Sequence, residues 1–82
     1  MSVKIYNRIS VLRAERELSR KALADAVGVN YQTIGYLERG DYNPSLELAL
    51  RLSEYFDAPV EAMFSLQPFP SLFGGGGTPQ KD

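Results

Sequence analysis

The sequence predicts an all-α domain of five short helices followed by a flexible C-terminal tail. Over residues 1–66 the apolar residues recur at helical spacing, without the alternation that marks strands. Residues that cap or stop helices separate these apolar runs. Because 82 residues are too few for two cores, we expect one domain over residues 1–66 and a tail over residues 67–82.

The first two helices follow from apolar spacing and from cap chemistry. An amphipathic helix is predicted over about residues 5–16, with an inner face of Ile5, Ile9 and Leu12. Ser19 is a good N-cap for a second helix over residues 20–27. Gly28 ends that helix, because glycine accepts the left-handed conformation without steric cost.

The remaining helices have the same punctuation. Asn30 caps the third helix and Gly40 stops it, Ser45 opens the fourth, and a short fifth helix follows Pro59. These three helices are predicted at residues 30–39, 45–56 and 60–64. The inner face of the fourth helix is expected to be Leu46, Ala49, Leu52 and Phe56.

The predicted tail combines three prolines with four consecutive glycines, a composition that does not hold a packed backbone. The apolar side chains of Phe69, Leu72 and Phe73 stand at its start. Two interpretations stay open for them: docking on the core or on a partner, and a tail that is simply disordered.

Composition excludes several kinds of chemistry. The chain has no cysteine and no histidine, which removes thiol catalysis, disulfides, imidazole bases and the usual zinc sites. No base, metal constellation or phosphate loop accompanies the remaining Ser, Tyr and carboxylates, so we expect no enzyme activity, no cofactor and no metal. There is no signal peptide and no apolar run of the ~20 residues that span a bilayer, so a cytoplasmic protein without membrane contact is expected.

The net charge of −1 hides an uneven distribution. Residues 1–40 carry seven Lys and Arg against four acidic residues, whereas residues 41–66 carry one Arg against five acidic residues. This asymmetry indicates one side that faces a polyanion and another that faces elsewhere.

The second and third predicted helices form a specific motif. Two short helices that cross steeply need a small residue at the crossing and a glycine in the turn, and Ala24 and Gly28 supply both. The motif reads LSRKALADAVGVNYQTIGYLERG over residues 18–40, continued by NPSL at residues 43–46. It resembles the lambda-repressor-like, Cro-type helix-turn-helix family of prokaryotic and phage transcriptional regulators, over about residues 5–64. The resemblance implies a DNA-binding domain that pairs as a homodimer.

The third helix has an outward face suited to the DNA major groove. With Ile34 inward, Leu37 and Glu38 fall on the inner side, and no acidic residue remains outside. Gln32 carries an amide that can pair bidentately with adenine, and a glycine permits close approach. The predicted base contacts are Tyr31, Gln32, Gly35 and Tyr36. For Tyr36, packing against a neighbouring loop is an open alternative.

Phosphate contacts are expected from polar residues around this face, at Arg13, Arg20, Arg39 and Asn43. In the family that the motif resembles, the residue matching Arg20 commonly contacts phosphate, and here arginine replaces the usual glutamine. Arg8, Arg16 and Lys21 fit a solvated face better.

Two positions depart from the family pattern. Glu17 stands where a turn glycine is usual, which predicts a turn that is either strained or differently shaped. Ala22 replaces a capping-box glutamate, so Ser19 caps alone.

Surplus apolar residues in the acidic half predict a symmetric dimer interface of Leu48, Leu50, Tyr55, Met63 and Leu66; the alternative is that they complete a small core. The predicted function is sequence-specific regulation, as a repressor that binds a palindromic operator with residues 30–39 in the major groove. The alternative is an antitoxin or adaptor of the same fold, whose apolar segment 69–73 wraps a protein partner.

Overall fold

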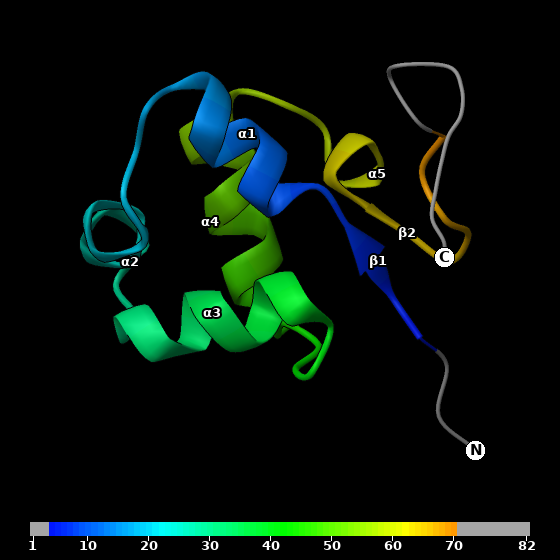
Figure 1. Ribbon diagram of the computed structural model, residues 1–82, viewed down its shortest axis with the longest axis horizontal. Helices are drawn as coiled ribbons and strands as arrows, with labels where there is room; N and C mark the ends of the chain where they lie inside the picture. The colour runs from blue at the N-terminus through cyan, green and yellow to red at the C-terminus, as the bar shows by residue number, and fades with distance from the viewer. Residues whose placement is uncertain (1–3, 71–82) are drawn as a thin grey trace.

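A computed structural model of the chain describes residues 4–70 and shows a mainly helical domain (Figure 1). In chain order its elements are β1 (Tyr6–Asn7), α1 (Ile9–Glu15), α2 (Arg20–Val27), α3 (Tyr31–Arg39), α4 (Leu46–Phe56), α5 (Val60–Met63) and β2 (Phe64–Ser65). The predicted class, a five-helix domain with a helix-turn-helix, is confirmed. The second, third and fourth helices have nearly the predicted bounds.

A two-stranded antiparallel sheet is the feature that the sequence pattern did not predict. Tyr6 pairs with Ser65 and Asn7 with Phe64, so the first helix begins at Ile9 and not at residue 5, and the fifth ends before Phe64. The Asn7 Oδ1 accepts a hydrogen bond from the Ile9 amide at 3.1 Å, at the start of α1. Strands of two residues contain no alternation that a sequence pattern could reveal.

Side-chain caps open the three central helices, and left-handed glycines end α2 and α3, as predicted; α4 ends instead at Asp57, with φ of 53°. The cap oxygens of Ser19, Asn30 and Ser45 accept backbone N–H groups at 3.0, 2.8 and 3.1 Å. Gly28 and Gly40 end α2 and α3 with φ of 78° and 80°. Ser19 bonds the Ala22 amide, which agrees with a cap that lacks a glutamate partner.

The core lies where α1, α2, α3 and α4 meet, with α5 and β2 closing one side (Figure 1). Its buried side chains are Ile9, Leu23, Ala24, Val27, Ile34, Leu37, Leu48, Ala49, Leu52, Phe56, Met63 and Phe64. The expected inward position of Leu46 is wrong: its side chain is 74% exposed. The first turn of α4 turns Leu48 inward instead.

The turn between α1 and α2 has the predicted unusual backbone. Glu17 adopts φ of +52°, in the left-handed region that disfavours residues with a side chain. The Leu18 amide donates to the Arg13 carbonyl at 2.9 Å, which keeps the turn tight. The chain therefore tolerates some backbone strain to place Ser19 at the start of α2.

Of the predicted tail, the structure describes residues 67–70; Leu72, Phe73 and the glycine run lie outside the described residues. The half-buried Phe69 ring has the Arg8 guanidinium 5.0 Å from its centroid. Within residues 4–70, no helix combines the length and the apolar character needed to cross a membrane.

Candidate nucleic-acid interface

The helix-turn-helix positions the outer face of α3. α2 and α3 are joined by the turn at residues 28–30, in which the Gly28 and Val29 amides both donate to the Ala24 carbonyl, at 2.8 and 3.0 Å. Ala24 is 1% exposed, and its small side chain allows the two helices to pack closely. Because Ile34 and Leu37 hold one face of α3 on the core, the opposite face lies open along the lower edge of the molecule in Figure 1.

The four predicted base-contacting residues lie together on this outer face. Tyr31 and Tyr36 are 55% and 47% exposed, and Gln32 is exposed between them. They surround a hollow of about 240 Å³ whose remaining lining is Gly35 with the arginines at positions 20 and 39. The α3 face, as predicted, carries phenol, amide and guanidinium groups.

Gly35 lies at the floor of the hollow and is buried by its surroundings. A Cβ built at this position would meet Nη1 of Arg39 at 3.6 Å, an ordinary van der Waals distance. The described part of the protein therefore leaves room for alanine, although glycine costs a helix about 1 kcal/mol relative to alanine.

The exposed ring of Tyr36 is contacted by an arginine of its own helix. The Arg39 guanidinium stacks over its ring, 5.1 Å from the centroid. Arg39 also donates from Nε to Asp41 at 3.1 Å, and its side chain is 54% exposed. Asn43, the last predicted phosphate contact, is exposed in the loop between α3 and α4. Arg39, Tyr36 and Asn43 thus remain accessible from solvent.

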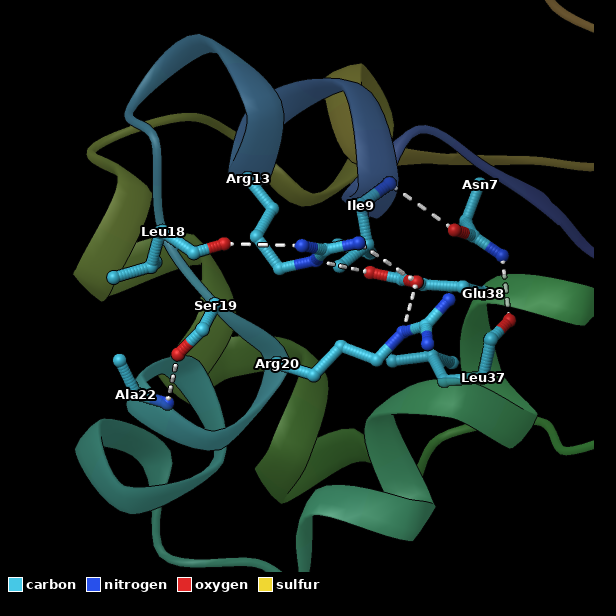
Figure 2. A network of polar contacts seen from close by, with 9 residues as sticks. All are labelled: Asn7, Ile9, Arg13, Leu18, Ser19, Arg20, Ala22, Leu37 and Glu38. Atoms are coloured by element: carbon cyan, nitrogen blue, oxygen red, sulfur yellow. Dashed lines mark hydrogen bonds and ion pairs between the residues drawn. The ribbon is translucent and has the colours of Figure 1, made fainter.

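The predicted phosphate contact at Arg13 is corrected, because each of its three guanidinium nitrogens donates a hydrogen bond within the protomer (Figure 2). Its Nε donates to Glu38 Oε2 at 2.7 Å, its Nη2 to Glu38 Oε1 at 3.3 Å, and its Nη1 to the Leu18 carbonyl at 3.0 Å. The Arg13 side chain is only 20% exposed. A buried carboxylate on α3 therefore recruits this arginine as a structural partner, which ties α1 to α3.

The role of Glu38 is the part of the site that sequence reasoning missed. Its side chain is 5% exposed and also accepts a hydrogen bond from Nε of Arg20, at 3.0 Å. Figure 2 shows the two arginines converging on this carboxylate from α1 and α2. The signal was present in the sequence: a glutamate on the inner face of a helix requires a cation nearby, because burying an unpaired charge is costly.

Two of the predicted dimer residues are wrong, because the protomer's own core uses them. Leu48 and Met63 are 4% and 0% exposed, so the alternative of core completion holds for both. Leu50, Tyr55 and Leu66 are exposed, at 54%, 37% and 65%. These three lie on different elements: Leu50 and Tyr55 on α4, and Leu66 directly after β2.

Leu66 borders the larger of two apolar surfaces. With Ile5, Val60 and Phe64 it lines a hollow of about 620 Å³ beside the small sheet, which we name the sheet groove. The other surface is the outer face of α4, where Leu46 and Leu50 lie among Glu47, Arg51 and Glu54. Within residues 4–70, no group of three or more acidic residues is arranged to hold a metal ion.

Comparisons with known proteins agree with this geometry. A helix-turn-helix family profile matches residues 9–62. The chain is 44% identical over 57 residues to an HTH-type transcriptional regulator of Archaeoglobus fulgidus, which covers 70% of this chain and 80% of the relative. It is 41% identical over 61 residues to the HTH-type transcriptional regulator YgzD of Bacillus subtilis, over 74% and 92% of the two chains.

A more distant relative is the cryptic phage CTXphi transcriptional repressor RstR of Vibrio cholerae, 30% identical over 59 residues, or 72% of this chain and 53% of that protein. The segment that the family profile matches contains α1 to α4 and therefore the whole helix-turn-helix. The chain belongs to the helix-turn-helix family of Cro/C1-type DNA-binding transcriptional regulators.

Proposed function

We propose that the protein is a sequence-specific repressor that occupies a palindromic operator as a homodimer, with α3 of each copy in the major groove. The observation that carries this proposal is the outer face of α3, where exposed Tyr31, Gln32 and Tyr36 surround a hollow beside two guanidiniums. Glu38, the acidic residue of this helix, is turned inward and paired. A helix face that is rich in hydrogen-bonding groups and free of carboxylates suits a polyanionic groove.

The side chains on this face have separable roles. Gln32 pairs bidentately with adenine N6 and N7 in the major groove. Tyr31 and Tyr36 pack on thymine methyl groups and donate hydrogen bonds to a base edge or phosphate. Gly35 has no side chain and lets the helix backbone approach the bases.

Phosphate binding comes from Arg20 and Arg39, which line the hollow on the α3 face, and from Asn43, which is exposed in the loop after α3. Four arginines in a dimer would displace about four counterions, so the logarithm of the association constant should fall with log salt at a slope near −4. A flat salt response contradicts this assignment.

The two copies pair through the sheet groove. It is apolar, Leu66 projects beside it with 65% exposure, and among the described residues Glu61 is the one charged residue in its lining. The outer face of α4 is less suited, because Glu47, Arg51 and Glu54 stand beside its two leucines, and the centre of a protein interface is depleted of charged residues. Sedimentation that gives only monomer at high micromolar concentration contradicts the dimer.

Repression is supported by the likeness to RstR, a relative named as a transcriptional repressor. A small DNA-binding domain can repress simply by covering an operator that overlaps a promoter. Loss of repression of a reporter when Gln32→Ala replaces the wild type would support this mechanism. Activation of the reporter by the wild-type protein would contradict it.

Selection of bound duplexes from a random pool tests the proposal as a whole. We expect a palindrome whose half-sites lie about 34 Å apart, one helical turn, or a multiple of it. Gln32→Ala should bind the selected operator more weakly, by about 1–3 kcal/mol for each lost bidentate contact. It should also lose the base preference at one base pair of each half-site. Lys21→Gln, on the solvated side of α2, is the control. Unchanged operator affinity in Gln32→Ala would overturn the placement of α3.

One observation favours the antitoxin or adaptor alternative. Leu46 and Leu50 lie one turn apart on α4, with 74% and 54% exposure. An exposed leucine pair on a helix fits a protein partner with an apolar face. Stoichiometric co-purification of the untagged protein with the product of a neighbouring gene, lost in Leu50→Glu, would support this function.

A further inference from the structure

The Glu38 carboxylate holds two guanidiniums that differ in their exposure. Arg13 approaches both carboxylate oxygens, at 2.7 and 3.3 Å, and is 20% exposed. Arg20 bonds only Oε1, through its Nε at 3.0 Å, and its side chain is 51% exposed. The two arginines therefore contribute differently to this cluster.

Arg13 alone supplies the neutralisation that the buried carboxylate needs. It makes a bidentate pair with Glu38 and fixes its own third donor on the Leu18 carbonyl. A half-exposed second ion pair adds little to stability, because solvent screens the charges. The contact between Arg20 and Glu38 is therefore poorly explained by stability alone.

The same contact fixes where the free end of Arg20 lies. Within the described residues, Arg20 is engaged through Nε, and the side chain borders the hollow on the outer face of α3 together with Gln32 and Gly35. Nη1 and Nη2 are thus left for a ligand on that face. Because one carboxylate is shared by two guanidiniums, the cluster of three keeps a charge of +1, and the carboxylate does not cancel attraction to an anion.

We propose that Glu38 is a positioning residue, which anchors the Nε of Arg20 so that its two terminal nitrogens bind a backbone phosphate of DNA beside α3. The proposal rests on the proposed DNA-binding function and assigns separate roles to the nitrogens of Arg20: Nε binds Glu38, and Nη1 and Nη2 bind phosphate. Arginine suits this role because its planar fork can use Nε for the anchor and both terminal nitrogens for phosphate. Anchoring also lowers the entropy that the long side chain loses on binding.

Arg20→Lys tests this division directly, because it keeps the charge and removes the fork. One ammonium cannot serve both the buried carboxylate and an outer phosphate with the same geometry. We expect Arg20→Lys to weaken operator binding by the dimer about tenfold, close to the loss in Arg20→Gln, since each lost charge-assisted contact is strong. Lys21→Gln removes a charge from the next residue, which pairs with Asp25 at the surface, and should change affinity much less. Wild-type affinity in Arg20→Lys would overturn the proposal.

Glu38→Gln separates two roles of Glu38, because a purely electrostatic role and an anchoring role predict opposite changes in operator affinity. Removing a negative charge near DNA should tighten binding if Glu38 acts only through its charge. Loss of the anchor should instead weaken binding, and the same substitution in an Arg20→Gln background should cause no further loss. Equal or tighter binding in Glu38→Gln, with the fold intact by circular dichroism, would overturn the positioning role. If that variant does not fold, Arg20→Lys decides, since Arg20 is half exposed.

Two further measurements identify the ligand. The salt slope of Arg20→Gln should be shallower than that of the wild type by about 2 for a dimer, one counterion for each copy. The loss of affinity should be equal across operator variants; a loss confined to one base pair would overturn the assignment to phosphate. If the wild-type protein shows no preference for any selected operator, the proposed function is refuted. If the wild type does prefer an operator and Arg20→Lys binds it with wild-type affinity, only this inference is refuted.

Discussion

Replacing Gly35 by alanine should stabilise the protein and weaken its binding to the operator. Gly35 lies in the middle of α3, where glycine is less favourable than alanine by about 0.8–1.0 kcal/mol. The new Cβ would lie 3.6 Å from Nη1 of Arg39, the far end of a flexible side chain, so it adds contact without a clash. The free energy of unfolding should therefore rise by about 1 kcal/mol, which raises the melting temperature by roughly 4–8 °C for a domain of this size.

On DNA the same methyl group has the opposite effect. It would occupy the floor of the hollow on the face that we place in the major groove, and would hold the helix backbone away from the bases. We expect operator affinity to fall about tenfold, which corresponds to about 1.4 kcal/mol. The assay pairs thermal unfolding by circular dichroism with fluorescence anisotropy on labelled operator. A scrambled duplex of equal length is the control, because loose phosphate binding should be affected less.

Two results would refute this reasoning. A lower melting temperature would show that the folded protein itself requires glycine at position 35. A higher melting temperature with unchanged operator affinity would show that no base or backbone approaches this part of α3. Only a gain in stability together with a loss of affinity agrees with the close approach.

Three further predictions test the fold and the pairing of copies. Glu17→Gly should raise the free energy of unfolding by about 1 kcal/mol, because it removes a side chain from a left-handed backbone of φ +52°; a lower denaturation midpoint in urea would contradict this. Arg13→Ala should lower the free energy of unfolding by about 3 kcal/mol in the same assay, since it removes the bidentate partner of the buried Glu38 carboxylate. A change within about 0.5 kcal/mol, the range of an ordinary surface substitution, would show that the pair does not stabilise the fold. Leu66→Glu should give a monomer in sedimentation and Leu50→Glu should not; the reverse pattern would move the interface to α4.

The helices of this protein were largely predictable because their signals are local. Ser19, Asn30 and Ser45 mark helix starts, and Gly28 and Gly40 mark helix ends, through contacts within one turn of the chain. The face of α3 followed from helical periodicity once Ile34 was set inward. Even the strained turn at Glu17 could be anticipated, from the resemblance to a family in which glycine is usual there.

What local signals missed depends on residues far apart in the chain. β1 and β2 pair across 57 positions, and two residues are too few to show a period. Leu48 and Met63 looked surplus on their own helices, yet the tertiary packing of α4 and α5 buries both. Periodicity identifies which side of a helix is apolar, but how much of that side is buried depends on the elements that pack against it in the folded protein.

The sequence by itself determined the helical class, the helix-turn-helix and the residues that α3 presents outward, because caps, glycines and apolar spacing act within one or two turns. Only the tertiary structure decided which arginines remain accessible to DNA. Arg13 and Arg20 are the same residue type, but the Glu38 carboxylate on α3 accepts from both Nε and Nη2 of Arg13 and only from Nε of Arg20. That distinction arises from the distance between three helices, which no local pattern records.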